Sequence, residues 1–269
     1  MQKRFWWRSL VGLGVLVIVG WLVFHRSPVG YQAHRTIQSG QLRATTFALV
    51  SSAENSTTAY QRQYRYIQDI GDGRGYTAGI IGFTTGNGDL RQVVLRYRQL
   101  RPRNDLNQFL PALKRVQGTA SHRGLGQPFV AAWRRAATDR QFVRAQDDIL
   151  NQQYLHPALR AARDDDLGPL GQYIYYDALV VHGPGHDATS FGGIRRRARH
   201  LARTPAQGGN PATYLRAFLR VRQGVMRQEA AHHDLSRLTV QRQLIRQRNF
   251  ALRHPLKWTM YGDHYHLAA

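Results

Sequence analysis

The chain has 269 residues, 42% of them hydrophobic, which is enough for one large domain or two lobes around a proper core. It contains no cysteine, so disulfide bonds and thiolate metal sites are excluded. The formal net charge is +22, from 38 lysine and arginine residues against 16 aspartate and glutamate residues. An excess of this size favours contact with an anionic surface or polymer.

The first 26 residues have the pattern of an export signal. A positively charged start precedes an uninterrupted apolar run, Leu10 to Phe24. Aromatic residues extend this segment to residues 5–24, so a cleaved signal peptide and a retained membrane anchor both stay open. In either case we expect an extracellular protein, with 27–40 as a linker and 41–269 as the folded domain.

Hydrophobic periodicity predicts the elements that follow the linker. Apolar residues at helical spacing predict a helix over 42–53 and a second, short helix over 60–67. Three glycines then interrupt the pattern, and 76–83 resembles a β-strand. After a Gly-Asn-Gly turn, Asp89 is in a good capping position for a helix that runs to about residue 100.

The remainder of the chain has mainly helical patterns, separated in several places by glycine-rich turns. The predicted helices cover 105–116, 128–136, 139–163, 168–182, 190–202, 211–229 and 235–252. The predicted fold class is therefore mainly α (α+β), with a small β element near 74–85.

Two isolated carboxylates lie at the boundaries of these elements. Glu54 follows the first helix, and Asp72 lies 18 residues later in a glycine-rich turn. The only other glutamate is Glu229. Acid–base cleavage of a glycosidic bond requires a pair of carboxylates on adjacent elements. On spacing alone, an alternative stays open in which Glu54 caps a helix and Asp72 only forms part of a turn.

Longer sequence motifs make the functional interpretation more specific. They include Ser-Ala-Glu-Asn around Glu54 and Asp-Ile-Gly-Asp-Gly-Arg-Gly around Asp72. Others lie at 49–56, 66–83, 110–114, 124–126, 175–177, 182–185, 189–195, 202–209, 255–258 and 261–263. With these strings the chain resembles the chitosanases of glycoside hydrolase family 46 over about 42–269. The resemblance implies a lysozyme-like catalytic domain, with two helical lobes, a cleft between them and a small sheet in the minor lobe.

The resemblance also implies a reaction and a set of site residues. The family cleaves β-1,4-linked glucosamine polymers in mid-chain with inversion, which assigns Glu54 as general acid and Asp72 as general base. Thr77 falls where the family helps to hold the attacking water. Substrate contacts are implied for Asn55, Tyr66, Arg74, Gly82, Asp89, Tyr154, His182, Glu229 and His232. Asp177, Arg222 and Arg237 are implied to form a supporting network.

Some of these residues also suit other roles. Asp89 also suits a helix N-cap. The glycines and proline between His182 and His186 exclude a helix that would bring both histidines to one face, so we expect no metal site and no cofactor. The basic run 195–199 lacks interleaved aromatic residues and a known module, so we expect no nucleic-acid binding.

The implied substrate, chitosan or a chito-oligosaccharide, is itself a polycation, so it does not explain the charge of the chain. We hypothesise that outer arginines hold the protein on an anionic cell-wall polymer or membrane surface. A monomer is expected. Two alternatives stay open: a hydrolase of another wall glycan, such as partly de-N-acetylated peptidoglycan, and a catalytically silent wall-binding protein.

Overall fold

The computed structural model describes residues 35–228 and 234–269. The predicted export segment, most of the linker, Glu229 and His232 lie outside these ranges. Within them, no helix has the length and apolar character needed to cross a membrane.

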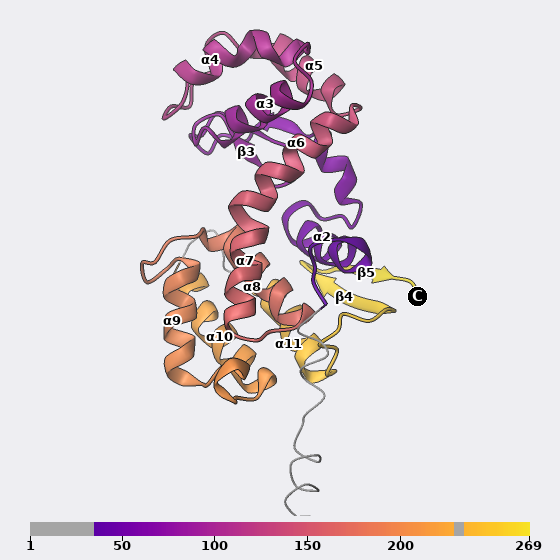
Figure 1. Ribbon diagram of the computed structural model, residues 1–269, viewed down its shortest axis with the longest axis vertical. Coiled ribbons are helices and arrows are strands. Elements are labelled where there is room, and N and C mark those ends of the chain that lie inside the picture. The colour runs from indigo at the N-terminus through magenta and orange to yellow at the C-terminus, as the bar shows by residue number, and fades with distance from the viewer. Residues whose placement is uncertain (1–34, 229–233) are drawn as a thin grey trace, which may run out of the picture.

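The described chain forms two lobes (Figure 1). The minor lobe contains the strands β1 (Ile67–Asp69), β2 (Tyr76–Ala78) and β3 (Phe83–Thr84) with the helices α3 (Asp89–Leu100), α4 (Leu110–Arg115) and α5 (Gly126–Ala136). The major lobe contains α2 (Gly40–Asn55), α8 (Pro169–His182), α9 (Phe191–Leu201), α10 (Pro211–Met226) and α11 (Ser236–Arg246), with the strands β4 (Leu256–Met260) and β5 (Asp263–Leu267). A mainly α chain with a small antiparallel sheet confirms the predicted fold class.

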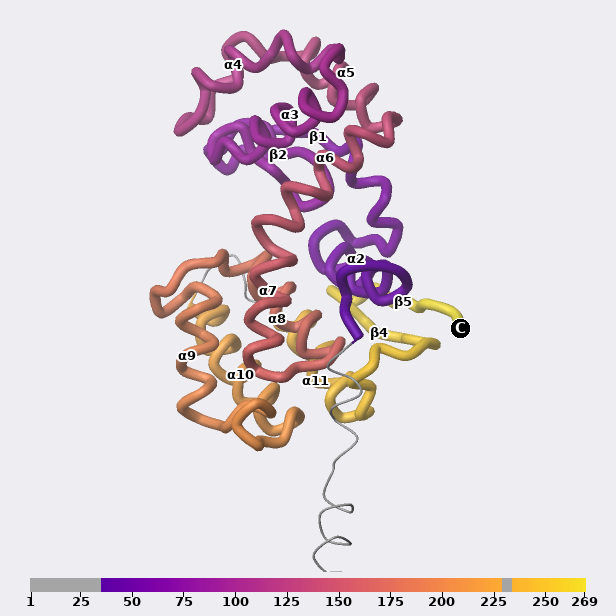
Figure 2. Tube along the Cα trace, in the orientation of Figure 1, coloured from indigo at the N-terminus to yellow at the C-terminus, as the bar shows by residue number. Residues whose placement is uncertain are grey.

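A long helical run connects the lobes (Figure 2). It was predicted as one helix over 139–163, and it consists of α6 (Arg140–Leu150), a π-helical turn η4 (Asn151–Leu155) and α7 (His156–Asp164). Pro157 lacks the amide hydrogen that would bond the carbonyl of residue 153, so the regular hydrogen-bond ladder is interrupted at this point.

Other boundaries differ from the predictions because of strand pairing and a glycine-containing turn. The second short helix is the 3₁₀-helix η2 (Tyr60–Arg65), and Ile67 opens β1 because it pairs with Ala78 of the neighbouring strand. The predicted strand over 76–83 is two strands joined by a turn, in which Gly79 has a φ of 79° and Gly82 a φ of 74°.

Three helical predictions in the remainder of the chain also need correction. The segment 105–116 divides into the 3₁₀-helix η3 (Asp105–Phe109) and α4, with a proline near the start of α4. Helix α10 ends at Met226 and α11 at Arg246, earlier than predicted.

The hairpin β4–β5 was not predicted. Its first strand alternates buried and exposed residues, with Leu256, Trp258 and Met260 facing inward. The indole of Trp258 donates a hydrogen bond to Ser52 Oγ over 3.0 Å. The hairpin therefore fixes the last part of α2, the helix that carries Glu54.

Candidate active site

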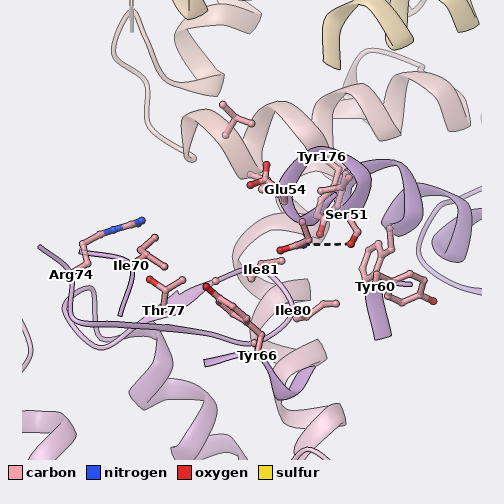
Figure 3. A pocket seen from close by; sticks show the side chains of 17 residues that line it. Ser51, Glu54, Tyr60, Tyr66, Ile70, Arg74, Thr77, Ile80, Ile81 and Tyr176 are labelled. Atoms are coloured by element: carbon pink, nitrogen blue, oxygen red, sulfur yellow. Dashed lines mark hydrogen bonds between the residues drawn. The ribbon is translucent and has the colours of Figure 1, made fainter. Parts of the chain in front are cut away.

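A cavity of about 380 Å³ lies between the two lobes. Helix α2 forms one wall and α8 contributes to it, while the minor-lobe segment 66–82 forms the opposite wall (Figure 3). The lining includes six of the predicted site residues: Glu54, Asn55, Tyr66, Arg74, Thr77 and Gly82. Residues of both lobes thus meet around one space. Tyr176, Val180 and Val181 of α8 come to it from a distant part of the chain.

Glu54 lies in the last turn of α2 with its side chain 41% exposed. Its Oε1 accepts a hydrogen bond from Nη2 of Arg237. The following helix, η2, has Ala59 at its N-cap and no side-chain capping bond. Glu54 is therefore not the cap considered from its spacing alone; it is a half-exposed acid that faces the cavity from the major lobe.

Asp72 lies in the exposed loop that precedes β2 and is held by Arg74. Its Oδ1 accepts the backbone N–H of Arg74 over 3.0 Å, and its Oδ2 accepts Arg74 Nε over 2.9 Å and Nη2 over 2.5 Å. The hydrogen bond from the Arg74 side chain is the main reason that the pKa of Asp72 is lowered. Asp72 does not itself line the cavity, but its arginine partner does.

Thr77 faces the cavity from β2. Its side chain is buried, and its Oγ1 has no hydrogen-bond partner among the residues that the structure describes. A buried hydroxyl is costly without a partner, so a water molecule or a substrate atom in the cavity is the natural one.

Behind Glu54 lies a buried ionic network that contains Asp177, Arg222 and Arg237. Asp177 on the buried helix α8 is fully enclosed. Its Oδ1 accepts Arg237 Nη1 over 2.8 Å and its Oδ2 accepts Arg222 Nη1 over 2.6 Å. Burial alone would raise the pKa of Asp177, but the two arginines outweigh it and lower the pKa. Because Arg237 also bonds Glu54, the network connects the core of the major lobe to the cavity.

Sequence reasoning missed one member of this network, Gln241. Its Nε2 donates to Asp177 Oδ2 over 2.8 Å, and its Oε1 accepts Arg222 Nη1 over 3.3 Å. The available signal was its position four residues after Arg237, on the same face of α11. The lining residues Ser51, Tyr60 and Tyr176 were also missed as site residues. Ser51 and Tyr60 both lie in segments for which the sequence predicts a helix.

The other predicted residues that the structure describes, His182, Asp89 and Tyr154, are not part of the cavity lining. His182 accepts a hydrogen bond from Arg222 Nε over 3.2 Å, so it contacts the buried ionic network. Asp89 begins α3 after the N-cap residue Gly88, and its Oδ1 accepts the backbone N–H groups of Thr84 and Leu90. Burial raises the pKa of Asp89, and Arg74 is close enough to act on it electrostatically.

Tyr154 lies close enough to Asp89 and Arg74 to interact with both electrostatically. Burial raises the pKa of its hydroxyl, with further influence from Asp89 and Arg74. Asp89 and Tyr154 are therefore within electrostatic range of Arg74, which lines the cavity. In the part of the chain that the structure describes, no three His, Asp or Glu side chains are grouped so as to hold a metal ion.

Comparisons with known proteins show the family of the chain. The model of glycosyl hydrolase family 46 matches residues 48–256. A chitosanase of Streptomyces sp. (strain N174) is 51% identical over 247 residues, which are 88% of this chain and 89% of that protein. A chitosanase of Bacillus subtilis (strain 168) is 31% identical over 272 residues, or 95% of this chain and 94% of that protein.

Solved structures are similar over the same range. The chitosanase OU01, crystallised with substrate, has a TM-score of 0.81 at 47% identity and is matched over 86% of this chain and 98% of its own. A family 46 chitosanase of Gynuella sunshinyii in complex with chitotetraose has a TM-score of 0.76 at 31% identity, over 86% of this chain and 99% of its own. By sequence and by structure, the chain belongs to glycosyl hydrolase family 46.

Proposed function

We propose that this protein is a chitosanase that cleaves β-1,4 linkages between glucosamine residues in mid-chain, by a single displacement with inversion. The observation that carries the proposal is the cavity between the lobes. Glu54 faces it from α2, while Thr77 and the arginine that holds Asp72 face it from the minor lobe. An acid and a base on opposite sides of one sugar-sized space are what an inverting glycosidase needs.

Glu54 acts as the general acid in this proposal. It donates its proton to the glycosidic oxygen as the bond to the anomeric carbon breaks, so the leaving sugar departs as a neutral alcohol. Arg237 holds the carboxyl group in place through Oε1, and Asp177 holds Arg237. The positioning of the acid thus depends on a rigid, buried part of the major lobe.

Asp72 acts as the general base on the opposite face of the sugar. It takes a proton from the attacking water, and that water forms the new bond to the anomeric carbon. The lowered pKa keeps Asp72 ionised, and therefore able to accept this proton, in neutral and mildly acidic solution. The free hydroxyl of Thr77 supplies a hydrogen bond that places the water.

We assign the recognition of glucosamine to Asp89, Tyr154 and Arg74, which interact with one another electrostatically. The backbone N–H groups of Thr84 and Leu90 both bond Oδ1 of Asp89, and we assign Oδ2 to the ammonium group of the substrate. A charge-assisted hydrogen bond of this kind cannot form with an N-acetyl group, so it favours deacetylated sugars. Asn55, Tyr66 and Gly82 line the rest of the binding space, and Glu229 and His232 are proposed on the resemblance alone.

Product analysis tests the proposal against a wall-glycan hydrolase and against a silent binding protein. The purified protein is incubated separately with glucosamine hexamer and with partly de-N-acetylated peptidoglycan, and products are followed by mass spectrometry. We expect internal cleavage of the hexamer to dimer, trimer and tetramer, and slow or no release from peptidoglycan. Because residues 1–26 carry an export pattern, we propose that this reaction takes place outside the cytoplasm.

The role of Thr77 gives a specific prediction. In Thr77→Val the shape is kept while the hydroxyl is lost, and we expect kcat to fall about tenfold because one hydrogen bond to the attacking water disappears. Unfolding stability should stay the same or rise, since this hydroxyl has no partner in the described structure.

Thr85→Val is the matched control. The hydroxyl of Thr85 donates to the Arg74 carbonyl over 3.2 Å and accepts the Tyr76 N–H over 3.0 Å. Its loss should lower the stability by about 1–3 kcal/mol. Equal losses of stability in the two variants would show that Thr77 has only a structural role.

The partnership of Asp72 and Arg74 predicts a pH effect. A base is active when deprotonated, and a lowered pKa extends its activity to lower pH. Arg74→Gln removes the main cause of the lowering, so the acidic limb of the kcat/KM profile should move to higher pH. Arg74→Lys, which retains the charge, should move the limb less. An acidic limb at the same pH in all three proteins would exclude Asp72 as the group that it reports.

A further inference from the structure

We propose that a second groove, between α7 and α9, binds a flexible anionic polymer whose acidic groups are phosphates or carboxylates. This inference goes beyond the proposed hydrolysis and rests on it in one step, the exclusion of the polycationic substrate from this groove. We call the site the arginine groove. Its lining consists of Pro157, Arg160, Ala161, Asp164, Leu179, Pro184, His186, Phe191, Gly192, Arg195, Arg196, Arg199, His200 and Gln207.

The arginine groove has a large excess of positive charge. Four arginines and two histidines line it, against the single carboxylate of Asp164. Arg160 is exposed and has no partner among the described residues, and Arg196 donates only to the His186 carbonyl, over 3.1 Å. Neither guanidinium is neutralised by a carboxylate. Like charges gathered in one hollow repel one another, so an anionic ligand would relieve a cost that the free protein carries.

A buried carboxylate also holds two of the groove arginines in fixed positions. Asp165 is completely buried under the groove, and its carboxylate accepts Arg195 Nε over 2.7 Å and Nη2 over 3.1 Å. The same carboxylate lies 3.3 Å from Nη2 of Arg199 and accepts the hydroxyl of Tyr175 over 2.5 Å. One buried charge thus orients two arginines toward the groove. Arg195 also pairs with Asp164 over 3.6 Å, so the charge without a carboxylate partner among the described residues is that of Arg160 and Arg196. This preorganisation distinguishes the groove from a surface of mobile arginines.

The arginine groove is distinct from the catalytic cavity. Helix α8 separates them: Tyr176, Val180 and Val181 line the cavity, whereas Leu179 lines the groove. Figure 1 shows α7 and α9 in the major lobe, away from the minor-lobe wall of the cavity. A polymer in the groove would therefore leave the cavity open to substrate.

The chemistry of the groove selects its partner. The proposed substrate is a polycation, which the arginines would repel, so they are not an extension of the substrate site. Guanidinium groups bind phosphate and carboxylate through paired N–H donors. Phe191, Leu179 and Pro157 add an apolar floor that suits the C–H surfaces of sugar or polyol units between the charges. An anionic envelope polymer has both features, and binding to it would hold the protein near its site of action.

Binding of a fluorescent poly(glycerol phosphate) decamer and of a polygalacturonate decamer to the full chain tests the proposal. The groove variant is Arg160→Gln with Arg196→Gln. The matched control is Arg98→Gln with Arg103→Gln, two exposed arginines of the minor lobe that have no partner in the described structure. Both variants lose the same charge. Thermal unfolding checks that each is folded.

For at least one of the two polymers we expect the groove variant to bind about tenfold more weakly at ~50 mM salt and the control variant about as tightly as the natural chain. The polymer that responds identifies the acidic group. Equal weakening in both variants would overturn the proposal, because the charge would then act without a defined site. Groove-dependent binding of phosphatidylglycerol vesicles, with neither polymer responding to the groove substitutions, would also overturn it in favour of a membrane contact. Hydrolysis of glucosamine hexamer, measured in parallel, should be the same in all three proteins.

Discussion

Replacing Glu54 by glutamine is expected to lower kcat for glucosamine hexamer by at least about 10³-fold, because a positioned general acid contributes up to ~10⁴-fold to a rate and a poor leaving group depends on it fully. The amide has the same shape as the carboxyl group but no acidic proton. It can still accept the hydrogen bond from Arg237, so the fold and the cavity should be preserved. Initial rates and thermal unfolding, measured on the same preparations, check both parts.

Asp105→Asn is the matched control for this substitution. Asp105 is a carboxylate of η3 in the minor lobe, with a side chain 69% exposed and a single ion pair to Arg135. Its conversion to an amide should leave kcat unchanged. A Glu54→Gln protein that is folded and retains more than about a tenth of the natural rate would contradict the assignment of Glu54 as the acid.

Replacing Asp177 by asparagine is expected to have the largest effect on stability, with a loss of about 3–5 kcal/mol. Among the described residues, this carboxylate is the only acidic group in contact with both Arg222 and Arg237, and it is fully buried. Without it, Arg237 keeps only Glu54 as an acidic partner among the described residues and the buried Arg222 has none, which is costly in a low-dielectric interior. Urea unfolding followed by circular dichroism measures the change.

The loss at Asp177 should depend on pH in a defined direction. The folded-state pKa of Asp177 is lowered, so its contribution is present above the unfolded-state pKa of ~3.9 and is lost as the pH falls through the folded-state value. The stability difference between Asp177→Asn and the natural chain should therefore be full at pH 6 and narrow in strongly acidic solution. Asp105→Asn, at an exposed pair, should change the stability by less than about 1 kcal/mol at either pH. Similar losses in both variants would show that the buried network contributes little.

Local patterns predicted most of the helices. The limits of α3 were obtained because the Gly-Asn-Gly turn and Asp89 mark its start, and its periodic apolar residues continue to Leu100. Helix α8 was found for a similar reason, with Pro169 at its first position and Gly183 after its end. These signals lie within a few residues of the element that they define.

Elements that depend on distant partners were predicted less well. Ile67 was assigned to a helix, but it pairs with Ala78 in a strand, and only the strand partner decides between the two. The hairpin β4–β5 was missed although Trp258 and Met260 alternate with exposed residues, because five residues are too few to distinguish a strand from the irregular end of a chain.

The candidate site shows the same division. Glu54 could be selected because the chain has only one other glutamate, and Asp72 because it lies in a glycine-rich turn 18 residues later. The contact of Glu54 with Arg237 joins positions 183 residues apart, and no spacing rule predicts it. The resemblance to the family implied a network of Asp177 with Arg222 and Arg237, but neither this contact nor Gln241 was predicted.

The anomeric form of the fresh product tests the central claim most directly. Glucosamine hexamer is mixed with the enzyme in an NMR tube, and the anomeric proton signals of the new reducing ends are followed before mutarotation is complete. Single displacement by water, with Glu54 as acid and Asp72 as base, inverts the β-linkage, so the α-anomer should appear first and then relax toward equilibrium. Initial formation of the β-anomer would contradict the account, because it requires a covalent intermediate and a different role for one of the two carboxylates.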